Sequence, residues 1–305
     1  MYADNLLYTI DGKMPYKSSN VNYGRLGALG AVYGATFVIQ HIAQMNTIWK
    51  DQTNFRFVED GKYALYVDKA GHFYGCYATQ YFARESFYWA GFSRKTSVWL
   101  GAALGLGYST YVEILDGFGW NWGFSPSDFY GDLAGTAFGV AQQYIPVLQN
   151  FSPKFQYFPS DWFGARKRIP ASQFIDDYSS QVFWMSINVH NLLPEKIKKF
   201  WPSWMQLSLG YTARNLCSAG EEECRNCNRT WDYMDNEVYG DPKFLISLDY
   251  DLVKILPEGG SFWNWIRQSL NLLKLPSPTL EISKSNTKFY LVYPFSINIG
   301  GSRIF

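Results

Sequence analysis

The segment Phe244-Leu245-Ile246-Ser247-Leu248-Asp249-Tyr250-Asp251-Leu252 alternates between an apolar face and a polar face. Phe, Ile, Leu and Tyr fall on one side, and the polar residues Ser247, Asp249 and Asp251 fall on the other. A hydrophobic period of two is typical of a β-strand with one buried face. The same alternation over residues 204–212 extends the pattern, so the C-terminal half is predicted to be an antiparallel β region.

Further strands are predicted at residues 181–189, 279–283 and 288–299, with one inserted helix at residues 261–273. Strands of about 9–11 residues with one apolar face, flanked by aromatic residues, are typical of an outer-membrane barrel wall. Phe305, at the end of the sequence, resembles the aromatic residue that often ends such barrels. We therefore expect residues 151–305 to be of outer-membrane-barrel type. The alternative is a soluble sheet that the helices cover on one face.

The first half of the chain has a helical period instead. Helices are predicted at residues 23–45, 68–89, 95–116 and 126–148. Gly131, Gly135 and Gly139 recur every fourth residue, as do Gly30 with Gly34 and Gly101 with Gly105. Since each glycine costs about 1 kcal/mol of helix propensity, such stripes indicate close approach between helices. The predicted fold class is α+β, with a glycine-rich helical bundle over residues 1–150 followed by the β region.

The composition bears on the protein's surroundings. Aromatic residues make up 19% of the chain and charged residues only 17%, whereas charged residues make up about 25% of a typical soluble domain. Such a balance favours a membrane interface or an aromatic-lined binding protein. A formal charge of +1 without any Lys/Arg-rich run argues against nucleic acid as a partner.

The termini and the uncharged stretches give two further expectations. The longest uncharged stretches are short or diluted by polar residues, whereas a membrane-spanning helix needs about 20 mostly apolar residues. They are residues 26–40, 96–112 and 133–153. None of them therefore reads as a conventional spanning helix. The start, Met1-Tyr2-Ala3-Asp4, has neither a basic and apolar leader nor a lipobox cysteine. We expect a signal peptide to have been removed from this numbering.

A set of polar residues is predicted to converge on one site in the helical module. The pairs Asp68/His72 and Lys69/His72 are four and three residues apart, so they face roughly the same way at the start of a helix. The other members lie at the end of the third helix and the start of the fourth. The full polar cluster is Asp68, Lys69, His72, Glu113, Asp116, Asp128 and Asp132.

This cluster has a functional and a structural interpretation. As a reactive site, its catalytic candidates are His72, Glu113 and Asp116, and its metal-ligand candidates are Asp68, His72 and Glu113. No cofactor is implied with certainty, and a divalent metal is the candidate. As a structure, the cluster is a buried ion network that locks the helices in register.

Helix ends add detail to both interpretations. Glu113 and Asp116 at a helix C-terminus oppose the helix dipole, so Lys69, a protonated His72 or a bound cation must hold them. Ser125-Pro126-Ser127-Asp128 fits a helix start with Ser125 as the N-cap.

The remaining histidines and cysteines carry weaker predictions. His41 and His190 lie in apolar surroundings and are interpreted as structural. Cys217, Cys224 and Cys227 lie in a polar stretch; a disulfide from Cys217 to Cys224 or Cys227 is favoured, since an all-cysteine zinc site needs four thiolates.

Several of these motifs resemble a known family. The chain contains four motifs in this order: Asp68-Lys69-Ala70-Gly71-His72, Glu113-Ile114-Leu115-Asp116-Gly117, Trp122-Gly123-Phe124-Ser125-Pro126-Ser127-Asp128 and Asp132-Leu133-Ala134-Gly135. Together they resemble the YfiM-like family of predicted periplasmic lipoproteins, a domain of unknown function. Their order is more distantly similar to the VanZ-like membrane proteins. Asp132 departs from the family pattern, which usually has Asn there. The resemblance implies a Gram-negative envelope location, in the outer membrane or the periplasm, and implies no activity.

Three functions remain as hypotheses. The leading one is a non-catalytic envelope protein, a structural or accessory subunit of an envelope assembly, with the outer membrane or lipid and other proteins as partners. The second is a membrane-proximal hydrolase or transferase that acts on lipid or cell-wall substrates through the His/carboxylate site. The third is a lipid- or glycan-binding module. The sequence favours a protein that is not an enzyme.

Overall fold

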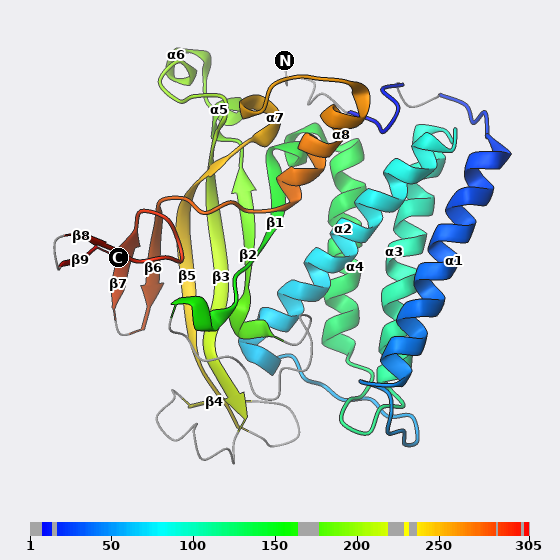
Figure 1. Cartoon of the computed structure of the whole chain (residues 1–305), viewed down its shortest axis with the longest axis horizontal. Coiled ribbons are helices and arrows are strands. Elements are labelled where there is room, and N and C mark those ends of the chain that lie inside the picture. The colour runs from blue at the N-terminus through cyan, green and yellow to red at the C-terminus, as the bar shows by residue number, and fades with distance from the viewer. Residues whose placement is uncertain are drawn as a thin grey trace.

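The chain is α+β, as predicted, with its helices gathered on one side of an antiparallel sheet (Figure 1). The computed structural model describes residues 8–13, 17–163, 177–218, 229–231, 237–284, 286–299 and 302–304. Four long helices fill the first half of the chain, and the sheet is built from the second half.

The long helices lie close to their predicted positions. They are α1 (Tyr23–Met45), α2 (Val67–Trp89), α3 (Arg94–Asp116) and α4 (Pro126–Tyr144). Helix α4 ends four residues before its predicted end, because Pro146 has no N–H to continue the helix and a 3-10 helix η2 (Pro146–Asn150) follows. Ser125 is the N-cap of α4, as predicted, and its Oγ accepts a hydrogen bond from the Asp128 N–H at 3.2 Å.

Helix α2 packs against α3 and α4 through glycine. A Cβ on Gly135 of α4 would lie 2.0 Å from the Phe73 carbonyl oxygen, and one on Gly101 of α3 would lie 2.8 Å from the Gln80 carbonyl oxygen. These glycines therefore let the helix backbones approach closely, as their spacing predicts. Gly30 and Gly34 of α1 have nothing within 4 Å of such a Cβ, so close packing at that pair was a wrong prediction.

The sheet is open, so the prediction of an outer-membrane barrel wall was wrong. Its strand order is β1-β2-β3-β5-β6-β7, with β4 paired to β5, and within the described residues β1 and β7 are its two edges. The predicted strand over residues 288–299 is interrupted at residues 291–296, and β8 pairs with β9 apart from the main sheet. The strands are β1 (Phe151–Tyr157), β2 (Gln181–Ile187), β3 (Met205–Ser218), β4 (Arg229–Trp231), β5 (Glu237–Tyr250), β6 (Thr279–Ser283), β7 (Thr287–Tyr290), β8 (Ile297–Ile299) and β9 (Ser302–Ile304).

Short helices connect these elements. The predicted helix at residues 261–273 is α8 (Ser261–Ser269) followed by a 3-10 turn η6 (Leu270–Leu272). The other short helices are η1 (Tyr63–Tyr66), η3 (Ser160–Phe163), η4 (Tyr178–Ser180), α5 (Val189–Leu192), α6 (Glu195–Lys198) and α7 (Leu252–Ile255).

Two helices are long and apolar enough to cross a membrane, judged by length and composition alone. They are α1, whose apolar window is not buried at all, and α3, whose window is 28% buried. Both helices extend beyond the uncharged stretches of the sequence, to 23 residues each.

Some predictions fall outside the described part of the chain. Cys224, Cys227 and Phe305 lie outside the described residues, and of Cys217 only the backbone is described, within β3. The predicted disulfide and the terminal aromatic residue therefore stay predictions.

Candidate functional site

A strained turn leads into the polar cluster. Ala64, Leu65 and Tyr66 have φ angles of 46°, 55° and 66°, so three consecutive residues with side chains adopt the left-handed conformation directly before α2. Each such residue costs about 1–2 kcal/mol. Runs of this kind persist only where surrounding contacts hold them, and they gather at functional sites.

The sheet supplies the contacts that hold this turn. The Tyr211 hydroxyl of β3 donates a hydrogen bond to the Leu65 carbonyl oxygen at 2.6 Å. A buried apolar cluster joins residues from the turn and the start of α2 to residues of η4 and β3; its members are Tyr63, Ala64, Leu65, Val67, Tyr178, Ala213 and Leu216. The second half of the chain thus fixes where α2 begins.

Asp68 and Lys69 are placed by this start. The Tyr178 hydroxyl donates to Asp68 Oδ1 at 2.6 Å, and Lys69 Nζ lies 2.8 Å from Asp68 Oδ2. Lys69 Nζ also lies 2.5 Å from Asp60 Oδ1 and forms an ion pair with Asp128 Oδ1. One ammonium group therefore contacts three carboxyl groups from three segments of the chain.

His72 lies among the remaining carboxylates. Its Nδ1 is 3.1 Å from Asp132 Oδ1, within hydrogen-bond distance. Its Nε2 is 3.7 Å from Asp68 Oδ1, 3.7 Å from Asp128 Oδ1 and 3.8 Å from Glu113 Oε1. These three separations are too long for hydrogen bonds. Nε2 therefore faces a ring of carboxylate oxygens without being bonded to one of them directly.

Glu113 and Asp116 both lie at the end of α3 but contact different residues. Glu113 is buried, and its Oε2 accepts a hydrogen bond from the Ser125 N–H at 3.0 Å. Asp116 Oδ1 accepts one from Trp49 Nε1 at 2.5 Å. The structure thus gathers six of the seven predicted residues around Lys69 and His72, whereas Asp116 contacts Trp49.

Burial and charge shift the pKa values of Asp68 and Lys69 in opposite directions. Burial alone would raise the pKa of Asp68, but Lys69 and His72 outweigh it and hold that pKa well below its ordinary value. Burial alone would lower the pKa of Lys69, but Asp68, Asp128 and Asp60 raise it. Both groups are therefore ionised at neutral pH.

The other members are shifted toward holding protons. Burial raises the pKa of Glu113 to about 8. Burial, together with the charge of Asp68, raises the pKa of Asp128 to about 9. Burial opposes a charge on His72, but its hydrogen bond to Asp132 and the nearby carboxylates raise its pKa well above the ordinary value. The site thus retains protons that a bound cation would replace.

The donor atoms fit a divalent metal ion. One ligand atom from each of Asp68, His72 and Asp128 lies within 4.8 Å of the others, and the same holds for His72, Glu113 and Asp132. Atoms that bind one metal at about 2.0–2.2 Å lie roughly 3–4 Å apart, as Nε2 and its carboxylate neighbours do. A histidine with oxygen ligands suits zinc, manganese or ferrous iron.

Two members of this site, Asp60 and Tyr178, were not predicted from the sequence. Asp60 Oδ1 accepts hydrogen bonds from Ser125 Oγ and Ser127 Oγ, in addition to its ion pair with Lys69. Tyr178 comes from the far half of the chain. Asp60 lies in a loop without helical spacing, and nothing in the sequence around Tyr178 indicates a contact with α2.

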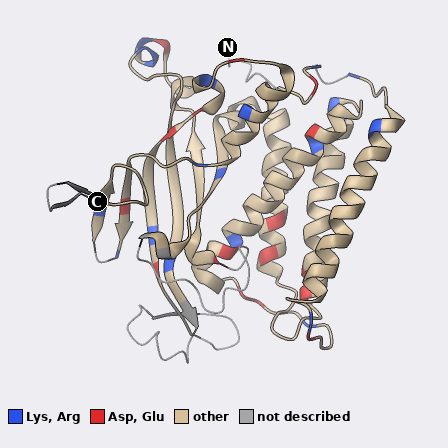
Figure 2. Ribbon diagram, in the orientation of Figure 1, with Lys and Arg blue, Asp and Glu red and all other residues tan. Residues whose placement is uncertain are grey.

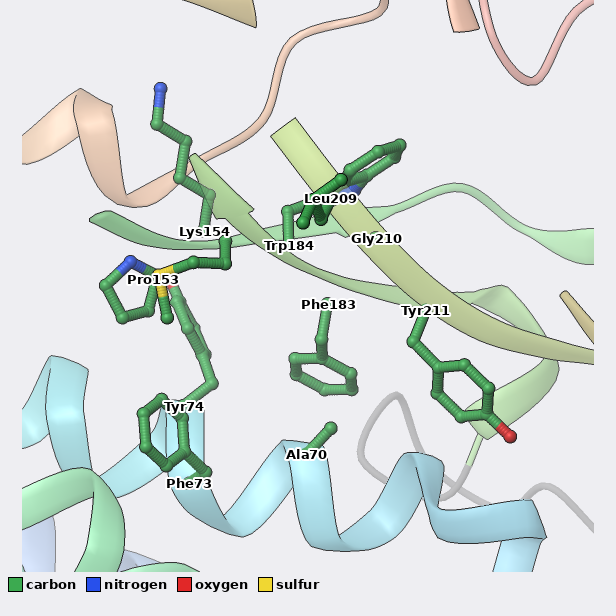
Figure 3. Close-up of a pocket in the computed structure, with 11 residues that line it drawn as sticks. Ala70, Phe73, Tyr74, Pro153, Lys154, Phe183, Trp184, Leu209, Gly210 and Tyr211 are labelled. Atoms are coloured by element: carbon green, nitrogen blue, oxygen red, sulfur yellow. The ribbon is translucent and has the colours of Figure 1, made fainter. Parts of the chain in front are cut away.

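A cavity of about 340 Å³ lies between α2 and the sheet, apart from the polar cluster (Figure 3). Helix α2 contributes Ala70, Phe73 and Tyr74 to its wall, and the sheet contributes Phe183 and Tyr211 among others. Its lining is mainly apolar and aromatic, so it lacks the polar groups that a glycan site needs.

The comparison with known families matches the helical part of this architecture. Residues 56–143 match the family described as predicted periplasmic lipoprotein (DUF2279). The matched segment contains the strained turn, α2, α3 and nearly all of α4. All seven residues of the polar cluster lie within it, whereas Tyr178 does not. The predicted family resemblance is confirmed for this segment, which is less than a third of the chain; the YfiM-like and VanZ-like links stay predictions.

The periplasmic-lipoprotein match also supports the predicted location. A periplasmic or envelope setting fits the description of the family, which assigns no activity. No curated protein and no solved structure matches the chain.

Proposed function

We propose that this chain is an envelope protein that binds a divalent metal ion at Asp68, His72 and Asp128 and uses it for hydrolysis or group transfer. The proposal includes a setting at the outer membrane, and the lipoprotein family description supports attachment to an envelope membrane. Of the three functions that the sequence left open, this is the hydrolase or transferase hypothesis.

The observation that carries the proposal is the arrangement around His72. Asp132 engages Nδ1 at 3.1 Å and so orients the ring, which aims Nε2 at two carboxylate oxygens 3.7 Å away. A carboxylate that accepts from one ring nitrogen while the other binds metal is a recurring arrangement in metal sites.

The charge balance also supports a cation. Five buried carboxyl groups share two basic side chains, Lys69 and His72; the carboxyl groups belong to Asp60, Asp68, Glu113, Asp128 and Asp132. Buried carboxylates without counter-charge are costly. The raised pKa values of Glu113 and Asp128 express that cost, and a divalent ion would remove it.

Glu113 is the candidate acid–base group. Its Oε1 lies 3.8 Å from His72 Nε2, the ring nitrogen that would hold the metal. The pKa of Glu113, about 8, lies near neutral pH, and a neighbouring cation lowers it further. A metal also acidifies its bound water, so Glu113 could accept the proton that this water gives up when it attacks the substrate.

Metal binding by the purified full chain tests the proposal. Mn²⁺ is the probe, since thiolates of the cysteine group bind it weakly. We expect one Mn²⁺ per chain by calorimetry and elemental analysis, with binding lost in Asp128→Asn and retained in the matched control Asp51→Asn, whose residue is exposed. A wild-type chain that binds no divalent metal would refute the proposal.

The leading sequence hypothesis, a structural subunit, makes the opposite prediction. In that case Lys69 and the retained protons satisfy the carboxyl groups, no metal binds, and His72→Ala lowers only stability or assembly. Lys69, which serves three carboxylates, is the observation that favours this second candidate. Turnover of an ester or phosphodiester lipid with Mn²⁺, lost in Glu113→Gln, separates the two.

A further inference from the structure

The seam between α2 and α3 is lined by polar and small residues rather than by large apolar ones. Along α2 every fourth residue is a buried or partly buried member of one stripe, and α3 presents a matching stripe of small and polar residues. The α2 stripe is Asp68, His72, Cys76, Gln80 and Arg84, and the α3 stripe is Ser97, Gly101, Gly105, Ser109 and Glu113. A helical bundle that folds in water buries its apolar stripe instead.

The outer surface of the same bundle is apolar. None of the residues of α1 is buried, and its side chains Val38, Ile39 and Ile42 are exposed by 53%, 67% and 55%. On α3 and α4, Trp99 and Leu133 are exposed as well. Contiguous apolar surface of this kind marks a contact with membrane or protein.

Charged residues lie at the ends of α1 and α3 and in the first two turns of α4 (Figure 2). We define the apolar belt as residues 26–45 of α1, 96–112 of α3 and 133–144 of α4, which contain no Asp, Glu, Lys or Arg. At about 1.5 Å per residue, residues 96–112 rise about 26 Å. The apolar band of outer-membrane β-barrels is about 25 Å tall, so the α3 stretch of the belt has the height of a hydrocarbon layer.

The sheet also has an exposed apolar face and a buried polar face. On β5, Phe244, Ile246 and Leu248 are exposed by 62%, 40% and 36%, whereas Ser247 and Asp249 of the opposite face are buried. Asp249 is neutralised by Lys154 at 2.8 Å. On these faces, helices and sheet both turn apolar side chains outward and polar ones inward, an arrangement that contact with lipid stabilises.

We propose that the apolar belt lies in the hydrocarbon layer of a lipid bilayer, with the polar cluster at one boundary of that layer. Glu113 directly follows the α3 stretch of the belt and Asp132 directly precedes the α4 stretch. A substrate at that level is the headgroup of a lipid. This substrate class rests on the proposed metal site, whereas the embedding does not.

A charge placed in the belt tests the embedding. The full chain is reconstituted into vesicles of phosphatidylethanolamine and phosphatidylglycerol, and the fraction that resists carbonate extraction and floats with the vesicles is measured. We expect Ile39→Lys, within the belt, to lower that fraction about tenfold. Tyr23→Lys, at a residue that is 81% exposed just outside the belt, is the matched control and should leave it unchanged.

A second measurement does not depend on the folding of Ile39→Lys. Lipids brominated midway along the acyl chain should quench the fluorescence that Trp99 contributes, obtained as the difference between wild type and Trp99→Phe. Trp120, exposed in the loop between α3 and α4, should escape that quenching. A wild-type chain that carbonate extracts from the vesicles, or a Trp99 that these lipids do not quench, would overturn the proposal.

The two proposals fail separately. Asp128→Asn should lose Mn²⁺ and still float with the vesicles. A chain that floats but binds no Mn²⁺ would keep the embedding and discard the metal site together with the headgroup substrate.

Discussion

Metal binding should release protons, and the affinity should rise steeply with pH. In the metal-free protein, the pKa values of Glu113 and Asp128 are raised to about 8 and about 9, and that of His72 lies well above its ordinary value. At pH 7 these groups therefore hold protons that a metal ion must displace. Each displaced proton makes the affinity rise about tenfold per pH unit below its pKa, since one unit corresponds to about 1.4 kcal/mol.

The expected magnitude follows from the number of groups that contact the ion. If His72 and Asp128 both lose a proton, the affinity for Mn²⁺ should rise about 100-fold between pH 6.5 and 7.5. Calorimetry in buffers of different ionisation enthalpy counts the protons directly, and we expect about two, or about three if Glu113 also ionises. Metal binding with no proton release would refute both the pKa assignments and the ligand set.

The same shifts fix the sign of the stability change in the metal-free protein. Glu113, Asp128 and His72 have folded-state pKa values above their unfolded ones, so their contribution is fully present at low pH. It is lost as the pH rises toward about 9. Thermal unfolding should therefore show a falling midpoint between about pH 5 and pH 9, and excess Mn²⁺ should reverse that fall at the alkaline end. A midpoint that rises across this range would contradict the shifts.

Three further predictions concern single contacts. Asp132→Ala should weaken Mn²⁺ binding about 10–100-fold, because His72 loses its orienting partner, whereas Asp132→Asn, which keeps an acceptor oxygen, should lose much less by the same calorimetry. Tyr178→Phe removes the hydroxyl that donates to the buried Asp68 carboxylate and should cost about 1.5–3 kcal/mol in denaturant unfolding, and an unchanged midpoint would contradict that contact. Gly135→Ala places a methyl group against the Phe73 backbone and should lower the free energy of unfolding by about 3 kcal/mol or more. Gly107→Ala, where a Cβ has nothing within 4 Å, should raise it by about 0.5–1 kcal/mol. Equal effects of the two substitutions in thermal unfolding would refute the close packing of α2 and α4.

Helix periodicity made the bundle and most of its site predictable. Spacing of three and four residues placed Asp68, Lys69 and His72 together, and those side chains do meet. The cap at Ser125 also follows from local chemistry, since the N-cap, the following proline and the Asp128 N–H all lie within four residues. Interactions of this range are encoded locally, so a single sequence reveals them.

Contacts between distant segments were not predictable in this way. Tyr178 reaches Asp68 across 110 positions of sequence, and Asp60 enters from a loop. The left-handed run at Ala64–Tyr66 contains no glycine to signal it. Asp116 lies three residues after Glu113 on the same helix, yet its side chain contacts Trp49, which lies far away in the sequence. These features depend on tertiary packing, which local patterns do not contain.

The barrel prediction failed for a physical reason that bears on function. Alternation along Phe244–Leu252 correctly indicated strands with an outward apolar face, but the same pattern does not say how many strands join the sheet or what closes it. Here the helical bundle lies beside the sheet, and Tyr74 of α2 stacks on Phe155 of β1. The sheet in turn holds the strained turn through Tyr211 and supplies Tyr178 to the site. The segment outside the family match is therefore part of the site's support, and the two halves should unfold in one transition rather than separately.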